Sequence, residues 1–247
     1  PPDCMNTFLR RAERVLALGT IGAILVEPMQ GRGGEIAPPD WFLPLLRSLA
    51  DQYHVLLIFD EIYTGFHRTG RRFACDHWDV QPDIICLGKA LTSGFPLAAC
   101  VGTAKVMDEA WPESTGEALH TSTFLGNPLG CRMALTSLDL LEAEPWSTRV
   151  EALGHYLRDG LLQLKSQSPR WGFIRGLGLM QGIELLNANG QPDAQGAGQL
   201  VETMLARGII ILGGGVEQNV ISFTPPFVIT QAEIDFALRE LSDATQR

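Results

Sequence analysis

Three short apolar runs place the strongest constraint on the fold of this chain. Residues 20–26 read TIGAILV, residues 55–59 read VLLIF and residues 83–87 read DIICL. Such nearly unbroken runs, rich in branched side chains, are typical of strands buried on both faces, which occur mainly in parallel sheets covered by helices. Helical segments alternate with these runs along the chain. The sequence therefore predicts an α/β fold with a mostly parallel sheet and helices on both faces.

Each of the three runs leads to an ionisable residue. Glu27 follows the first run, Asp60 follows the second, and Lys89 follows the third after one glycine. In open parallel sheets the ligand crevice lies beyond the carboxyl ends of the strands. One charged residue at a strand end is routine, but three at adjacent strand ends predict a functional site.

The pattern changes after Glu144 and Pro145. The segment FIRGLGLMQGIEL (173–185) predicts a strand, a glycine-rich kink and a second strand. Thr230 and Glu233 have the spacing of a capping box, which predicts the start of a last helix. We expect two domains, an α/β part over residues 1–144 and a small C-terminal α+β domain over residues 145–247. Helices are expected at 8–18, 40–53 (capped by Asp40), 127–143, 147–164, 194–207 and 230–241, with further short strands at 97–102, 209–212 and 220–223.

Composition excludes several classes of function. The net charge of −9 argues against a nucleic-acid partner, because phosphate binding needs a basic face. No apolar run approaches the roughly 20 residues that span a bilayer, and the first residues have no signal-peptide core. The five cysteines, two of them (Cys86 and Cys100) inside apolar runs, form no CxxC pair, which favours reduced thiols in a cytoplasmic protein.

Nucleotide and metal sites are disfavoured as well. The segment LGKALTS (87–93) lacks P-loop glycine spacing and has Ala90 where Mg²⁺ binding requires Ser or Thr. The segment RGLGLMQG (175–182) misses the dinucleotide fingerprint by one residue and lies between expected strands. The five histidines lack the spacing of metal ligands.

Lys89 has two interpretations. Only three of the 19 basic residues are lysines, so an aminoalkyl side chain at a buried strand end needs a reason. Lys89 could extend to solvent or pair with Asp60 or Glu61. Alternatively, a desolvated lysine loses its proton readily and attacks aldehydes, while Asp60 could hold a ring nitrogen protonated. That is the pair of groups that pyridoxal phosphate needs.

Four segments, in this order and spacing, carry a resemblance to a known family: VEPMQGRGG (26–34), LLIFDEIYTGFHRTG (56–70), PDIICLGKALTSGFPLAA (82–99) and HTSTFLGNPLGCRMA (120–134). They resemble the class III aminotransferases, fold-type I enzymes that use pyridoxal phosphate and include ornithine, acetylornithine and 4-aminobutyrate aminotransferases. The resemblance implies transfer of an amino group from an amine or amino acid to a 2-oxo acid or aldehyde. It also implies that residues 1–144 are the C-terminal part of the large, cofactor-binding domain.

The resemblance also implies residue roles. Lys89 would carry the cofactor as a Schiff base, and Asp60 would pair with the pyridine nitrogen. Glu27 would be a carboxylate beneath the cofactor. Thr123 would give its hydroxyl to the cofactor phosphate of a second subunit, so a homodimer is expected. Tyr63 stands where many members have a glutamine that contacts the cofactor.

Two departures from the family pattern matter. The family's N-terminal part, with a phosphate-gripping loop and an aromatic that stacks on the ring, is lacking here, so we expect these 247 residues alone to bind cofactor poorly and to be inactive. Members with a Glu–Arg switch for α-carboxylates have Glu and Arg at the positions of Arg32 and Ser222. Arg32 could meet an acidic group of the substrate, or it could point to solvent or pair with Glu35. The first option favours an ω-amino acid or a plain amine as donor.

Two alternatives to an aminotransferase stay open. Racemases, aminomutases and lyases of the same fold also use the lysine and the aspartate. A truncated homologue that folds or dimerises without catalysis would keep the same motifs.

Overall fold

The structure is a computed structural model that describes residues 2–111, 113–116 and 120–245 of the chain. Tertiary contacts divide these residues into two compact units. The first unit runs to Pro28 and continues over Pro38–Phe66 and Cys75–Glu144. The second unit comprises Met29–Ala37, His67–Ala74 and the residues from Pro145 onward.

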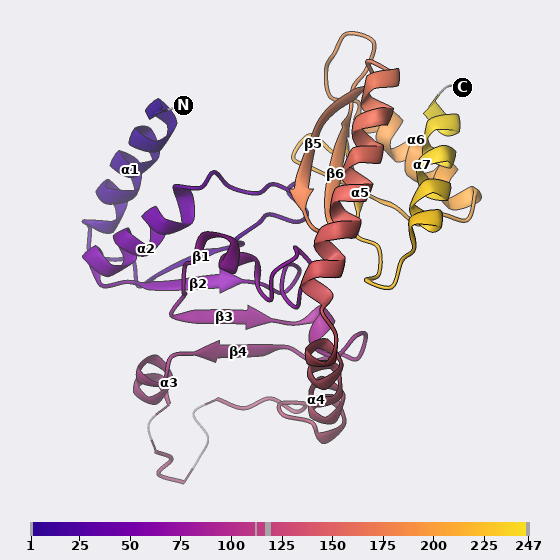
Figure 1. The fold of residues 1–247 in the computed structure, drawn as a ribbon. Coiled ribbons are helices and arrows are strands. Elements are labelled where there is room, and N and C mark those ends of the chain that lie inside the picture. The colour runs from indigo at the N-terminus through magenta and orange to yellow at the C-terminus, as the bar shows by residue number, and fades with distance from the viewer. Residues whose placement is uncertain (1, 112, 117–119, 246–247) are drawn as a thin grey trace. The chain divides into compact units, whose positions relative to one another are not determined.

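The first unit contains a four-stranded sheet in the order β1-β2-β3-β4. The first three strands are parallel, and β4 is antiparallel to β3 (Figure 1). The fold class expected from the apolar runs is therefore confirmed. The strands are β1 (Ala23–Val26), β2 (Leu56–Asp60), β3 (Ile84–Leu87) and β4 (Ala99–Gly102).

Helix α2 covers one face of this sheet. Its buried residues Leu43, Leu46 and Leu49 lie on one side of the helix, and α2 packs on β1 and β2, where Leu57 and Phe59 are fully buried. Burying a leucine or phenylalanine side chain contributes roughly 1.5–3 kcal/mol. Helix α2 spans Phe42–Tyr53. The other helices are α1 (Pro2–Leu16), α3 (Ala104–Ala110) and α4 (Pro128–Ala143). Short 3₁₀ turns lie at Ala74–Trp78 and Lys89–Leu91.

The opposite face of the sheet is less covered over the described residues. Leu25 on β1 alternates with the inward-facing positions and is 66% exposed. Within the part of the chain that the structure describes, helix α2 therefore covers β1 and β2 on one face.

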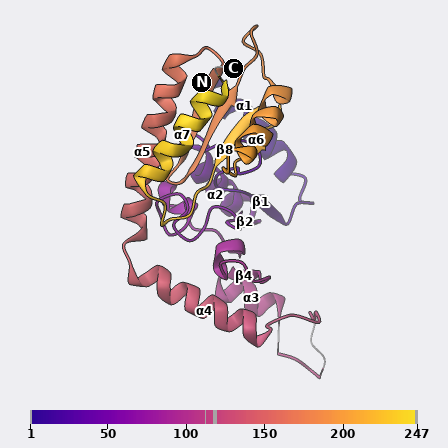
Figure 2. The same cartoon turned by 90° about the vertical axis from the view of Figure 1, so that its right-hand side faces the viewer.

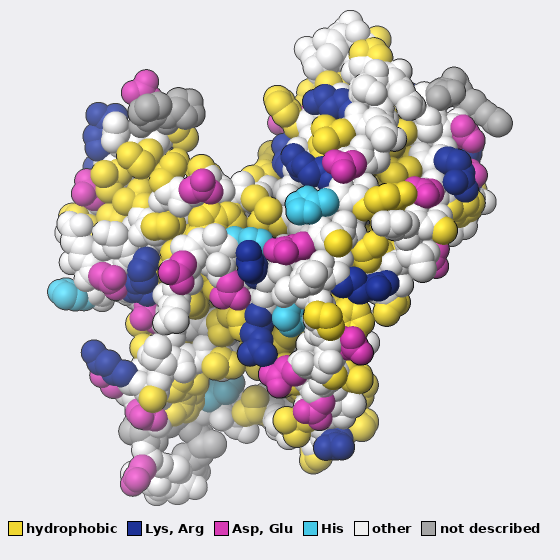
Figure 3. All heavy atoms as spheres, in the orientation of Figure 1, with side chains coloured by type: hydrophobic (Ala, Val, Ile, Leu, Met, Phe, Trp, Pro, Cys, Tyr) yellow, Lys and Arg dark blue, Asp and Glu magenta, His cyan; other side chains and the backbone are white. Residues whose placement is uncertain are grey.

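Two expectations about the N-terminal helices are wrong. Helix α1 begins at Pro2 instead of Phe8, because proline is tolerated in a first helical turn and Asp3 suits that end of the helix dipole. Asp40 does not cap α2: Trp41 occupies the cap position without a side-chain hydrogen bond. The ring of Phe8 meets Phe42 edge-on at a centroid distance of 5.2 Å. Figure 3 shows hydrophobic side chains gathered over α1 and α2.

The second unit contains an antiparallel sheet in the order β5-β6-β8-β7. Helices α5 and α7 lie side by side in it (Figure 2). Its core joins leucines of α5 to the strands and to α6 and α7. The elements are α5 (Trp146–Gln167), β5 (Trp171–Leu177), β6 (Met180–Leu185), α6 (Ala194–Ala206), β7 (Leu212–Gly214), β8 (Val220–Phe223) and α7 (Gln231–Thr245).

One strand of the second unit is displaced from its expected position. The apolar run 209–212 predicted a strand, but β7 begins at Leu212. Ile209 donates its N–H to Met204 O at the end of α6 instead, and Ile210 is 81% exposed. The helix terminus therefore uses the backbone donor that a strand would need.

The predicted capping box at α7 is confirmed. Thr230 N–H donates to Glu233 Oε2 at 2.7 Å, and Glu233 N–H donates to Thr230 Oγ1 at 3.3 Å. The Thr230 backbone hydrogen bond lowers the pKa of Glu233.

Two arginines hold the early segments 29–37 and 67–74 within the second unit. Arg175 Nε donates to Gly34 O at 2.6 Å, while its Nη1 pairs with Glu184 at 2.8 Å. Arg68 Nη1 donates to Pro225 O at 2.6 Å, and its guanidinium lies 4.7 Å from the centroid of the Phe227 ring. No sequence pattern marks these contacts.

A glycine allows one of these segments to approach closely. A Cβ at Gly178, in the turn between β5 and β6, would lie 2.5 Å from Thr69 C, and the φ of Gly178 is 52°. Both the contact and the conformation require glycine there.

Over the described residues, no helix is long and apolar enough to cross a bilayer.

Candidate functional site

Three of the predicted residues stand at the carboxyl ends of neighbouring parallel strands. Val26 is the register partner of Phe59, so Glu27 and Asp60 follow at the same level of β1 and β2. Asp60 is the last residue of β2 and is the register partner of Cys86 on β3. Lys89 comes two residues after the end of β3. The sheet topology thus brings all three to one edge of the first unit.

The two adjacent acids at the end of β2 have different environments. Asp60 is half-buried, and its Oδ1 accepts the N–H of Ile62 at 3.0 Å, which fixes the carboxylate at the strand end. Glu61 is fully buried: its Oε1 accepts Cys75 N–H at 2.8 Å, and its Oε2 accepts the Thr64 hydroxyl. Burial and the nearby Glu61 carboxylate raise the pKa of Cys75. The Glu61 carboxylate therefore stabilises the local structure through its hydrogen bonds, whereas Asp60 is the acid that lies at the edge of the sheet.

Lys89 adopts an uncommon backbone conformation. Its φ is +40°, in the left-handed region that costs a non-glycine residue energy, and such outliers concentrate at functional sites. Its side chain is exposed in the part of the chain that the structure describes. Its Nζ lies 4.8 Å from the centroid of the Tyr63 ring, within cation–π range. The aromatic ring of Tyr63 therefore contacts the ammonium group of Lys89.

The turn that carries Lys89 is tied to helix α4. Ser137 Oγ donates to Ala90 O at 3.1 Å and lies 3.3 Å from Ser93 Oγ. Leu91 N–H donates to Gly88 O at 2.9 Å, which closes the short 3₁₀ turn. Sequence reasoning missed Ser137, because a lone serine inside a helix carries no recognisable signal.

Thr123 lies in a turn of the first unit, apart from the strand ends that carry Glu27, Asp60 and Lys89. It is exposed in the turn over residues 123–126, ahead of α4, where the Asn127 side chain accepts Gly130 N–H at 2.7 Å. Phe124 and Leu125 in the same turn are 78% and 61% exposed. Residues 112 and 117–119 of the neighbouring segment lie outside the described residues.

The two switch positions both lie near Gly214 in the second unit. Ser222 is buried in β8, opposite Gly182 on β6 and Leu212 on β7. Arg32 is exposed, and its carbonyl accepts Gly215 N–H at 3.0 Å. A Cβ on Gly214 would lie 3.3 Å from Arg32 O and 3.6 Å from Ser222 Oγ.

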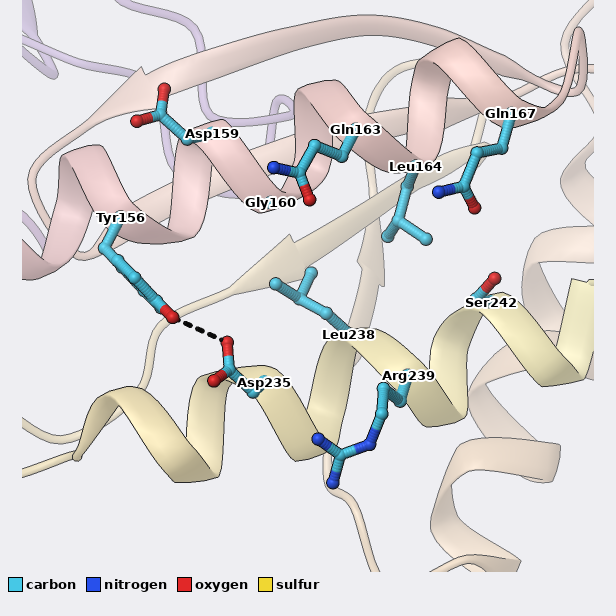
Figure 4. Close-up of a pocket in the computed structure, with 10 residues that line it drawn as sticks. All are labelled: Tyr156, Asp159, Gly160, Gln163, Leu164, Gln167, Asp235, Leu238, Arg239 and Ser242. Atoms are coloured by element: carbon cyan, nitrogen blue, oxygen red, sulfur yellow. Dashed lines mark hydrogen bonds between the residues drawn. The ribbon is translucent and has the colours of Figure 1, made fainter.

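Two hollows are lined by residues of the second unit. One, of about 520 Å³, lies between α5 and α7, where Leu238 packs against Gly160 and Tyr156 donates to Asp235 Oδ1 at 2.8 Å (Figure 4). This hydrogen bond raises the pKa of Tyr156. The other, of about 420 Å³, is mainly apolar and includes Ser222 in its lining. Among the described residues, no three His, Cys, Asp or Glu side chains gather as metal ligands would.

Comparisons with known proteins agree on one family. The family model described as aminotransferase class-III matches residues 3–245. The 4-aminobutyrate aminotransferase GabT of Escherichia coli (strain K12) is 38% identical over 242 residues, which are 97% of this chain and 56% of that protein. An alanine/serine racemase of Pyrococcus horikoshii is 34% identical over 249 residues, 99% of this chain and 51% of that protein.

Solved structures give the same result. The ornithine aminotransferase of Toxoplasma gondii, whose structure shows partial occupancy of PLP at the active site, superposes with a TM-score of 0.84 at 36% identity. The match covers 96% of this chain and 53% of that one. The chain therefore spans about half the length of the relatives that it matches.

Proposed function

Because this chain belongs to the class-III aminotransferases, we propose that its whole protein uses pyridoxal phosphate to transfer an amino group from an amine or amino acid to a 2-oxo acid or aldehyde. One observation carries this proposal: a primary amine, Lys89, and a carboxylate, Asp60, stand at the carboxyl ends of adjacent parallel strands. In this reading the first unit belongs to the cofactor-binding domain, and the residues from 145 form the small domain.

The residues at this edge fit the cofactor chemically. Pyridoxal phosphate, when bound, supplies an aldehyde that condenses with amines and a ring that takes up electrons. Lys89 would bind the aldehyde carbon covalently through Nζ, as a Schiff base, and would move a proton once its amine is free. Asp60, held by the Ile62 N–H, would keep a proton on the ring nitrogen. Glu27 would add negative charge beside Asp60, and Tyr63 would hold the free Lys89 ammonium.

The test of the proposed function is a half-reaction without an acceptor. We expect the visible absorption band of the protein loaded with pyridoxal phosphate to shift when an amine donor is added, with release of the carbonyl product. Adding a 2-oxo acid should restore the first band. A racemised or eliminated product without amino transfer would instead support the racemase or lyase alternative, and a protein that takes up no cofactor would support a non-catalytic homologue.

The donor is proposed from the second unit. Ser222 is buried where the family switch would place an arginine, so this strand offers no guanidinium to an α-carboxylate. Arg32 is exposed, and its backbone carbonyl accepts the N–H of Gly215. Its guanidinium could therefore bind an acidic group of the substrate. We propose that the donor is an ω-amino acid or a plain amine.

This donor proposal predicts a pattern across substrates. We expect 4-aminobutyrate, ornithine or a simple primary amine to exceed alanine in kcat/KM. Arg32→Ala should lower kcat/KM for acidic donors by roughly tenfold or more, since a charge-assisted hydrogen bond contributes ~1.5–3 kcal/mol, and should leave the simple amine unchanged. If alanine is the best donor and Arg32→Ala changes no value by more than about twofold, the donor proposal fails while the aminotransferase assignment stands.

A homodimer is the proposed assembly. Thr123 would give its hydroxyl to the phosphate held by the other subunit, and the exposed Phe124 and Leu125 beside it would be buried at the interface. We expect sedimentation of a dimer or larger species, and Phe124→Asp should shift it towards monomer and weaken cofactor binding. Val228→Asp, at a residue 65% exposed in the second unit, is the matched control. A monomer that binds pyridoxal phosphate tightly would contradict the proposal. We also propose a cytoplasmic location for the protein, as expected from its cysteines.

A further inference from the structure

Two cysteines face each other across neighbouring antiparallel strands of the first unit. Cys86 on β3 and Cys100 on β4 are register partners, so their side chains project from the same face of the sheet. Both are free thiols, Cys86 half-buried and Cys100 exposed. Desolvation by burial raises the pKa of Cys86, and charge interaction and hydrogen bonding with Cys100 raise it further.

The hydrogen-bond pattern shows which kind of pair this is. Thr103 N–H donates to Asp83 O at 3.0 Å, so the hydrogen-bonded positions between β3 and β4 alternate from that pair, and Cys86 with Cys100 falls between them. Glu61 N–H donates to Cys86 O at 3.0 Å, which confirms that this peptide carbonyl points towards β2 and away from β4. The cysteines therefore form a non-hydrogen-bonded pair.

That geometry suits a covalent link. Non-hydrogen-bonded partners have the closest approach across an antiparallel pair, with Cα atoms about 4.5 Å apart. Disulfides join Cα atoms that are about 4.4–6.8 Å apart. The pair therefore lies within disulfide range without any movement of the strands along each other.

We propose that Cys86 and Cys100 form a redox-active dithiol that low-molecular-weight disulfides close into a cross-strand disulfide. The exposed Cys100 thiolate attacks one sulfur of the oxidant and expels one thiolate, leaving a mixed disulfide. The Cys86 thiolate then attacks the Cys100 sulfur and expels the second thiolate. Two cysteine thiols lose two electrons and two protons, and one oxidant disulfide becomes two thiols.

The position of the pair gives this chemistry a consequence. Cys86 is the register partner of Asp60, and Lys89 follows it by three residues. Closing the pair would fix β3 to β4 at the point where β3 leads into the candidate site.

The test uses the folded protein and oxidised glutathione, followed by thiol blocking and peptide mass mapping. We expect a cross-link between the Cys86 and Cys100 peptides, two hydrogen masses lighter than the reduced pair, that dithiothreitol reverses. Cys131→Ser, which removes an exposed thiol on α4, should keep the cross-link. Cys86→Ser should leave Cys100 as a stable glutathione adduct.

Two outcomes would overturn the proposal. The first is glutathione adducts on Cys100 in the wild-type protein without a cross-link to Cys86. The second is a cross-link that forms equally well in urea, because proximity in sequence and not the fold would then explain it.

Discussion

Replacing Lys89 by alanine is expected to lower turnover by at least about 10⁴-fold, the upper end of what one positioned base supplies, because the nucleophile is lost together with the base. Lys89→Arg should be equally inactive. It keeps a cation that can lie over the Tyr63 ring, where Lys89 Nζ is 4.8 Å from the centroid, but an arginine does not attack an aldehyde.

The other two lysines of the chain are the controls for this result. Lys165 also has its Nζ over an aromatic ring, 5.4 Å from the centroid of Phe173, but it lies on α5 of the second unit. Lys105 is exposed on α3. Lys165→Ala and Lys105→Ala should keep turnover within about twofold, since substitutions at exposed positions are usually mild. Near-normal turnover of Lys89→Ala would contradict the assignment.

Replacing Asp60 by alanine should separate cofactor binding from catalysis. The variant should still take up pyridoxal phosphate, since Lys89 remains. Its turnover should fall by about 10³-fold, ~4 kcal/mol of barrier, because no anion holds the proton at the ring nitrogen. Measurement of cofactor uptake by absorbance and of single-turnover rates distinguishes the two effects.

Asp60→Asn sharpens this experiment. Asparagine keeps an oxygen that can accept the Ile62 N–H, which Asp60 Oδ1 accepts at 3.0 Å, so the strand end should stay in place. Only the charge is lost. We therefore expect Asp60→Asn to be nearly as slow as Asp60→Ala while it unfolds at the wild-type temperature. An Asn variant with wild-type rates would show that the Asp60 charge has no part in the reaction.

The parallel sheet and its charged edge could be predicted because both are local in sequence. Each apolar run specifies its own strand, and the parallel arrangement follows from strands that alternate with helices. Once the strands are placed, Asp60 and Lys89 must lie near one edge. The capping box at Thr230 was equally readable, since its two hydrogen bonds join residues three positions apart.

The contacts that escaped prediction are those made between distant segments. Arg68 and Arg175 bind backbone carbonyls, and a carbonyl is present at every residue, so no sequence pattern marks the partner. The facing of Cys86 and Cys100 depends on strand register, which the run LAACVG could not specify.

Borohydride labelling tests most directly whether Lys89 is the residue that binds the cofactor covalently, because these 247 residues contain only two other lysines, Lys105 and Lys165. The whole protein, loaded with pyridoxal phosphate, would be reduced with borohydride, digested and mapped by mass spectrometry. We expect the phosphopyridoxyl mass on the peptide that contains Lys89, with Lys105 and Lys165 unmodified. A label on any other lysine with Lys89 unmodified, or no labelled lysine in a protein that shows amino transfer, would contradict this assignment.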